Sequence, residues 1–347
     1  MFGVIAVRAE GEISIVLTFT GDCTLGSTDR RRGKDDSFDA FIGKFGYGWP
    51  FARVRDFFAE DDVTVINLEN VFYDSTYGRV KKTYNFRGPT DFARILPEGS
   101  VELAYLGNNH IMDYGAPGMR RTIEALEEQG VGWCFSSREK SGYFVFEKEG
   151  VKVGFAGAYI SYWGTNSVRM AATFQQMRDE GCDAIVGIIH GGAEYSPKRA
   201  KRQENMAAWM VRNGASLVIG HHPHVVQGVD RIGEATVIYS LGNFSFGGNK
   251  DLRADKALVA RAVLQFDGKG EYLGHQVNLI PISPSGALTY NNYQPVFLSG
   301  ERALETMKLV QNDTDFLLEP YQEGIGALQP FVPAQMPGNS YQVIQGD

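Results

Sequence analysis

Histidines in this 347-residue chain gather where they could hold a metal ion. Five of the six follow short aliphatic runs: His110, His190, His221, His222 and His224. Carboxylate and amide side chains occupy the same kind of position, namely Asp22, Glu69 and Asn109. Imidazole nitrogens together with carboxylate and amide oxygens form the mixed ligand set of Mn, Fe, Zn and similar divalent ions. The pattern therefore predicts a metal centre.

The His222-Pro223-His224 triplet predicts two imidazoles that point into one site. Alternate residues of an extended loop face the same side, and the intervening proline stiffens the segment. We therefore expect an extended backbone here, with one histidine available to each of two metal ions.

The Gly107-Asn108-Asn109-His110 segment combines a metal ligand with a proton carrier. The side-chain carbonyl of Asn109 can coordinate a metal, and His110 can donate a proton to a leaving oxygen. Asp113 lies three residues further on and can orient the His110 imidazole.

These polar residues are placed by strands that end directly before them. The predicted strands are Ile13–Thr20, Val63–Ile66, Leu103–Leu106, Cys182–Ile189, Ser216–Ile219 and Thr236–Leu241. In an open α/β sheet the carboxyl ends of the strands form the crevice where ligands bind. Side chains far apart in the sequence are therefore expected to meet at one edge.

Helix-length patterns separate several of these strands. They are Ala116–Gln129 and Pro197–Asn213, the second with Ser196 as its N-cap, and Gly300–Asn312 is a further candidate helix. Two hairpins are also predicted, one pairing residues 142–146 with 151–159 and one pairing residues 256–266 with 272–282. Alternating strands and helices favour a layered α/β fold, and the hairpins favour mixed sheets.

The chain divides into a core domain and an appendage. Residues 13–282 carry the strand and helix alternation, so we expect one α/β domain there. Residues 283–347 show weaker alternation and are predicted to be a C-terminal extension. Its end, from Val332 onward, is rich in Pro, Gly and polar residues and is expected to fray.

Composition excludes several classes of protein. Forty-one acidic and thirty-four basic residues give a net charge of −7, which argues against a nucleic-acid binder. Three widely spaced cysteines indicate neither a disulfide framework nor a Cys-rich zinc site. The apolar stretch Phe2–Val7 is too short for a signal peptide, and no stretch approaches the ~20 residues of a membrane-spanning helix.

Six motifs in order resemble those of the CapA family of poly-γ-glutamate capsule synthesis proteins. They are Gly21-Asp22, Asn67-Leu68-Glu69, residues 107–110 with Asp113-Tyr114-Gly115, residues 190–195, residues 220–224 and residues 240–244. An ordered set of short motifs is more specific than any one of them. This family belongs to the calcineurin-like metallophosphoesterases. The resemblance implies a four-layer α/β/β/α sandwich, in which two mixed β-sheets are flanked by helices.

The resemblance also implies a role for each site residue. Asp22 and His224 would hold one metal ion, Asn109, His190 and His222 a second, and Glu69 would bridge the two. His110 and Asp113 would be catalytic. The candidate substrate-binding residues are Arg87, Glu194, Tyr195, His221 and Asn243. Two divalent ions (Mn, Fe or Zn) would activate a hydroxide and neutralise charge on substrate oxygens.

The implied function is metal-dependent hydrolysis linked to capsule or poly-γ-glutamate synthesis. The substrate would be a phosphoester or an anionic polymer, and other capsule-synthesis subunits are possible partners. Family members commonly act at the cell envelope behind an N-terminal anchor, whereas this sequence shows no anchor, so a cytoplasmic location stays open.

A second hypothesis is a non-catalytic capsule-assembly or polymer-binding protein with an incomplete metal site. The first motif of the superfamily is Asp-x-His, and this chain has Thr24 at the third position. That departure favours the second hypothesis, and metal analysis discriminates between the two.

Overall fold

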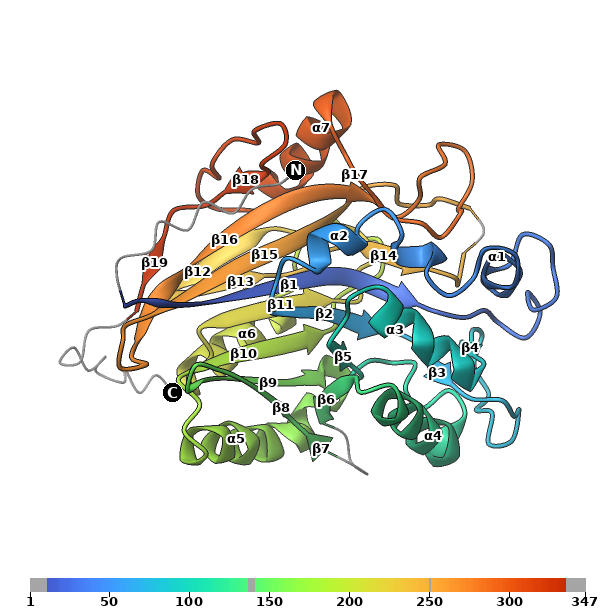
Figure 1. Ribbon diagram of the computed structural model, residues 1–347, viewed down its shortest axis with the longest axis horizontal. Helices are drawn as coiled ribbons and strands as arrows, with labels where there is room; N and C mark the ends of the chain where they lie inside the picture. The colour runs from blue at the N-terminus through green and yellow to red at the C-terminus, as the bar shows by residue number, and fades with distance from the viewer. Residues whose placement is uncertain (1–10, 137–140, 250, 335–347) are drawn as a thin grey trace.

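The computed structural model describes residues 11–136, 141–249 and 251–334, and these form a mixed α/β protein (Figure 1). Seven α-helices occur in the described residues: α1 (Phe38–Phe45), α2 (Arg55–Phe58), α3 (Ile95–Glu98), α4 (Gly115–Glu128), α5 (Trp163–Asp179), α6 (Lys201–Arg212) and α7 (Gly300–Gln311). The predicted mixed α/β class is therefore confirmed.

The first part of the sheet system is built around β1. Its strands run in the order β16 (Tyr272–Ser283), β15 (Ala257–Phe266), β1 (Ile13–Thr24), β2 (Val63–Leu68), β5 (Leu103–Tyr105) and β6 (Gly132–Ser136). From β1 to β6 the strands are parallel, whereas β15 and β16 are antiparallel to their neighbours. The short strand β14 (Asn243–Phe246) pairs with the end of β1.

The second part is built around β10. Its order is β8 (Phe144–Lys148), β9 (Val151–Tyr159), β10 (Ala184–His190), β11 (Leu217–His221), β13 (Ala235–Ile238) and β12 (Val229–Ile232). The four inner strands are parallel and the two outer ones antiparallel. A bridge between Ser136 on β6 and Ala158 on β9 joins the two parts.

Side-chain alternation along β10 explains why both faces of this strand are covered. Val186 and Ile188 belong to the large core cluster that also contains the β1 residue Leu17. Ile185 and Ile189 point to the opposite face and belong to a second cluster with residues of α5 and α6. Successive side chains of a strand face opposite sides, so a strand buried on both faces is aliphatic throughout.

Most predicted elements are confirmed, but the start of α6 is not where the sequence placed it. The helix begins at Lys201 rather than Pro197, and its N-cap is Ala200 rather than Ser196. The backbone just before the helix forms hydrogen bonds with a side chain from another segment, because the Gln227 amide donates to the carbonyls of Ser196 and Lys198. Helix α5 was not predicted at all.

The region after residue 282 contacts the core sheet. Three short strands pair antiparallel with β16: β17 (Val296–Phe297), β18 (Ala327–Leu328) and β19 (Val332–Pro333). Figure 1 shows α7 on the β16 side of the molecule and α4 and α5 on the opposite side. The proposed division at residue 282 stays a prediction. Most of the predicted frayed terminus, and the Phe2–Val7 stretch, lie outside the described residues.

No helix among residues 11–136, 141–249 and 251–334 is long and apolar enough to cross a membrane.

His275, the sixth histidine, is a structural residue that connects the two parts of the sheet system. It lies on β16, is fully buried, and its Nε2 is 2.7 Å from Thr236 Oγ1 on β13. Its Nδ1 is 2.7 Å from the Tyr272 hydroxyl. Burial lowers the pKa of His275 to about 4, so the ring is neutral near pH 7.

We expect His275→Gln to remove one pH-dependent contribution to stability. The unfolded chain protonates this histidine near pH 6.5 and the folded chain only near pH 4, so its contribution is lost as the pH falls between these values. Urea unfolding in chelator should show the stability difference between wild type and variant shrinking by about 2 kcal/mol from pH 7 to pH 5. An equal difference at both pH values would contradict this assignment.

Candidate metal centre

Strand register brings the predicted ligands to one edge. Asp22 on β1 is aligned with Asn67 on β2, and Glu69 follows two residues later. His190 ends β10 and is aligned with His221, which ends β11. The parallel strands therefore deliver their C-terminal side chains to a common crevice.

All six predicted metal ligands meet there. Glu69 Oε1 lies 3.6 Å from His190 Nε2 and 4.0 Å from His224 Nε2. Asp22 Oδ2 is 3.0 Å from His224 Nδ1, and the Asn109 side-chain oxygen is 2.8 Å from His190 Nε2. His222 completes the set, since its ring centroid is 4.7 Å from that of His190.

Glu69 is a buried carboxylate without a hydrogen-bond partner. Its side chain is fully buried, and within the described part of the chain neither of its oxygens takes part in a hydrogen bond. The nearest imidazole nitrogens stand 3.6–4.0 Å away, too far for hydrogen bonds. An orphaned buried carboxylate is costly, and a cation among these groups would satisfy it. The residues present therefore fit a metal ion.

Two groups of side chains could each hold an ion, and Glu69 belongs to both. One group is Glu69, His222 and His224, and the other is Asp22, Glu69 and His190. Within each group the candidate ligand atoms lie within 4.8 Å of one another. The grouping differs from the predicted allotment, which placed His224 with Asp22 and His222 with His190. Which residues hold which ion stays a prediction.

Asp22 is the hydrogen-bonding hub of the centre. Its oxygens accept from the Asn67 side chain at 2.7 Å and from the His222 backbone N–H at 3.3 Å. Burial alone would raise the pKa of Asp22, but His221 and His224 outweigh it and hold that pKa well below its usual range. Asp22 is therefore ionised at neutral pH.

The ring nitrogens differ in basicity across the centre. Burial lowers the pKa of His190 well below its usual value and that of His222 to about 4. His224 is also buried, but the charges of Glu69 and Asp22 raise its pKa to about 10. Metal binding must displace the proton from His224, so affinity should rise with pH.

The backbone of the His222-Pro223-His224 triplet is not extended. His222 and His224 have φ values of 100° and 59°, which lie in the left-handed region. The predicted extended loop is therefore wrong, although the two rings still converge, with centroids 6.0 Å apart. Non-glycine residues in this region cost about 1–3 kcal/mol each, a strain that is typical of functional sites.

His110 and Asp113 form the pair that the sequence predicted. Asp113 Oδ2 lies 2.7 Å from His110 Nδ1, and the opposite ring nitrogen faces Glu69 Oε1 at 3.9 Å. Burial lowers the pKa of His110, so its ring is neutral near pH 7. The pair thus lies at the edge of the centre with one nitrogen fixed and one directed inward.

Four of the five candidate substrate-binding residues are divided between the inside and the rim of the centre. The Asn243 side-chain oxygen accepts a hydrogen bond from His224 Nδ1 at 2.9 Å, and His221 Nδ1 lies 3.5 Å from Asp22 Oδ1. Glu194 and Tyr195 are exposed on the rim, where the Tyr195 ring is 5.9 Å from that of His224.

Arg87 is held by neighbours other than the metal ligands. Its guanidinium pairs with Asp29 at 2.8 Å and donates to the Tyr73 carbonyl at 3.2 Å. A role in substrate contact stays a prediction.

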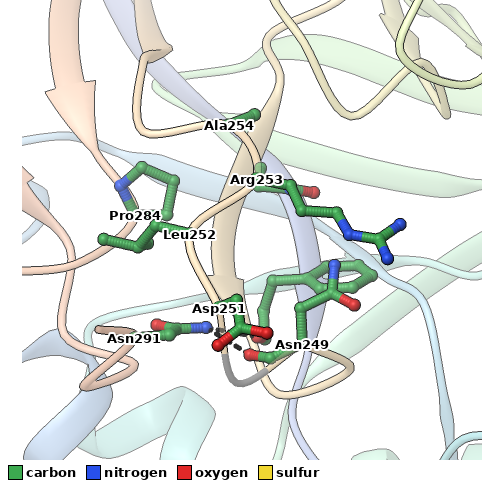
Figure 2. A pocket seen from close by; sticks show the side chains of 9 residues that line it. Asn249, Asp251, Leu252, Arg253, Ala254, Pro284 and Asn291 are labelled. Atoms are coloured by element: carbon green, nitrogen blue, oxygen red, sulfur yellow. Dashed lines mark hydrogen bonds between the residues drawn. The ribbon is translucent and has the colours of Figure 1, made fainter. Parts of the chain in front are cut away.

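A pocket next to the centre is lined by Asn243 and Phe246, and also by Asn249, Asp251, Arg253 and Asn291, which are labelled in Figure 2. Phe246 packs against His224 with ring centroids 5.0 Å apart. The Arg253 side chain extends away from Asp251 in this view, and its guanidinium stands over the Tyr195 ring at 5.9 Å. The exposed side of the centre is therefore bordered by a cation and an aromatic ring.

Three further residues support the centre: Asn67 and Asn108, for which no role was predicted, and Thr24, which was noted only as a departure from the superfamily motif. Asn67 links Asp22 to Asn108, whose side chain donates to Asn67 Oδ1 at 3.0 Å. Thr24 is fully buried and its hydroxyl donates to the Glu69 carbonyl at 3.3 Å. Asn67 and Asn108 stand in the recognised motifs and could have been found from strand register; the role of Thr24 follows only from the fold.

Comparison with known proteins assigns the chain to a family. The family model for the bacterial capsule synthesis protein PGA_cap matches residues 16–248, which is more than half of the chain. The chain belongs to the PGA_cap family. The matched PGA_cap region contains all six predicted metal ligands.

Two curated relatives are similar to this PGA_cap member over most of its length. The capsule biosynthesis protein CapA of Bacillus anthracis is 27% identical over 71% of this chain and 63% of its own. The PGA biosynthesis protein CapA of Bacillus subtilis (strain 168) is 27% identical over 80% of this chain and 75% of its own. The chain thus spans just under two thirds of the first relative. One crystal structure covers 77% of this chain at a TM-score of 0.36 and 10% identity, too low to assign a fold.

Proposed function

We propose that this protein is a metal-dependent hydrolase of capsule or poly-γ-glutamate synthesis, in which Glu69 would belong to the ligand sets of both of two divalent ions. The observation that carries the proposal is the buried, unpartnered Glu69 carboxylate surrounded by the imidazoles of His110, His190 and His224. The names of the two relatives support a role in capsule or PGA biosynthesis. On this proposal the core is a four-layer α/β/β/α sandwich, and the protein works at the cell envelope with other capsule-synthesis subunits.

The residues of the chain divide the work of hydrolysis. Divalent ions bound here would supply charge neutralisation and an acidified water. Asp22 orients His224, and Asn109 orients His190. His110 stands with Nδ1 fixed by Asp113, so its Nε2 is the atom that would take up a proton from water and pass it to the leaving oxygen of a phosphoester or to the leaving nitrogen of a poly-γ-glutamate amide.

A non-catalytic polymer-binding protein is the second candidate function. It is favoured by Thr24, which stands where the superfamily motif has a metal-binding histidine. Thr24 is fully buried and bonded to the Glu69 carbonyl, so this position supplies no imidazole.

Metal content and turnover discriminate between the two functions. Protein purified without chelator should contain divalent metal and hydrolyse an aryl phosphate or a short γ-glutamate oligomer when Mn²⁺ is added. EDTA should abolish that activity. Metal-free protein that binds the oligomer but hydrolyses neither substrate with added Mn²⁺ would support the non-catalytic function instead.

A further inference from the structure

Lys82 contacts three residues at the edge of the centre although it comes from a separate segment. It lies between β3 (Val71–Phe72) and β4 (Arg87–Gly88), and 29% of its side chain is exposed. Its ammonium pairs with Asp113 Oδ1 at 2.5 Å and donates to the Asn109 carbonyl at 2.9 Å. It also lies 3.2 Å from His110 Nδ1.

The ammonium of Lys82 is the counter-charge of a fully buried carboxylate. Asp113 has no exposed surface, and its Oδ2 accepts from the Phe86 backbone N–H at 2.6 Å. A buried carboxylate that loses its cationic partner is strongly destabilised. Lys82 therefore supplies the positive charge that offsets the burial of the Asp113 carboxylate beside His110.

The three contacts also fix the orientation of the His110 ring. His110 Nδ1 is closer to Asp113 Oδ2, at 2.7 Å, than to the Lys82 ammonium, at 3.2 Å. A carboxylate only accepts and an ammonium only donates, so His110 Nδ1 carries the ring proton and donates it to Asp113 Oδ2. Nε2 of the ring is thereby left facing Glu69.

A second consequence concerns the Asn109 backbone. The Lys82 ammonium binds the Asn109 carbonyl, while the Asn109 side chain binds His190 Nε2 at 2.8 Å. The Lys82 ammonium therefore contacts the predicted metal ligand Asn109, the proton carrier His110 and Asp113, which orients the His110 ring.

We propose that Lys82 is a positioning residue that holds Asn109, His110 and Asp113 in their working arrangement. The kinetic consequence rests on the proposed hydrolase function, whereas the effect on the His110 ring does not. Lys82→Met should lower kcat for an aryl phosphate by about 10–100-fold, the range found for residues that orient metal-site groups, while KM changes less than about threefold. Lys82→Arg should retain part of the activity. Lys81→Met, an exposed neighbour, is the matched control and should behave as wild type.

Chemical rescue and NMR of the histidine rings distinguish the positioning of His110 by Lys82 from a general loss of stability in the Lys82 variants. Ethylammonium should restore part of the lost kcat to Lys82→Ala and leave wild type and Lys81→Met unchanged. In metal-free protein the ring ¹⁵N shifts of His110 should move in Lys82→Ala, whereas those of the remote His275 should not.

The NMR measurement tests the positioning role of Lys82 even if the wild-type protein has no hydrolytic activity. A wild-type protein without activity would count against the proposed hydrolase function but not against the role of Lys82. Unshifted His110 signals, or an unchanged kcat in an active enzyme, would overturn the role of Lys82. Should Lys82→Ala fail to fold, Lys82→Arg and Lys82→Met give the same comparison.

Discussion

Glu69→Gln is expected to abolish divalent-metal binding and, at the same time, to stabilise the metal-free protein. Glu69 is shared by both groups of potential ligands, so its loss affects both. Changing residues that only orient ligands typically costs 10–100-fold in affinity, so Mn²⁺ affinity should fall by at least about 100-fold here. Isothermal titration with Mn²⁺ measures this, and hydrolysis should fall to background with it.

The stability gain has a pH dependence of defined sign. Burial, together with the charge of Asp22, raises the pKa of Glu69 well above its usual value. The unfolded carboxyl thus loses its proton at lower pH than the folded one, and the stability of the metal-free wild type decreases as the pH rises above the normal carboxyl range. Glutamine does not titrate, so the variant avoids this loss.

Urea unfolding in EDTA tests the gain directly. At pH 8 we expect Glu69→Gln to be about 1–3 kcal/mol more stable than wild type, the usual penalty of an unsatisfied buried polar group, with a smaller difference at pH 5. Glu147→Gln is the matched control, because Glu147 is exposed on β8. A variant less stable than wild type in EDTA would show that Glu69 has a structural partner.

His190→Ala and His222→Ala are each expected to remove one metal ion and to leave the other. His190 belongs to the group with Asp22, and His222 to the group with His224. If two ions are bound, elemental analysis after Mn²⁺ loading should give about two ions per wild-type chain, one per chain for either variant and none for Glu69→Gln. His275→Gln, which alters no predicted ligand, is the control.

The outcome separates a two-ion centre from a one-ion centre. A single ion in wild type that is lost completely in both histidine variants would contradict the bridging role of Glu69. Hydrolysis should be lost in both variants, since both ions act on one substrate.

The meeting of the candidate ligands at one edge of the sheet could be predicted from the sequence because these residues directly follow strands. Asp22, Glu69 and His190 each stand at the end of an aliphatic run, and parallel pairing brings such ends together. The presence of a strand depends on the local pattern of hydrophobic residues, and this pattern can be read from the sequence.

Features set by tertiary contacts could not be predicted. Lys82 stands in a polar segment between two short strands, and nothing in its local sequence indicates that it reaches Asp113. The left-handed backbone of His222 and His224 depends on the surrounding fold, since local preference favours extended conformations. The start of α6 likewise differs from the predicted one, because the Gln227 side chain donates a hydrogen bond to the Ser196 carbonyl in the segment before the helix.

One missed element did have a sequence signal. Met170, Phe174 and Met177 of α5 recur at helical spacing and are all fully buried. Polar residues lie between these three side chains, so the helical spacing of the apolar residues was not recognised.

The most direct test of the metal centre is anomalous diffraction from a crystal soaked in Mn²⁺. We predict two anomalous peaks, each about 2–2.5 Å from an oxygen of Glu69, one also reached by His222 and His224 and the other by Asp22 and His190. Absence of any peak near Glu69 at millimolar Mn²⁺, with the six side chains placed as described, would contradict the proposal that this cluster binds metal.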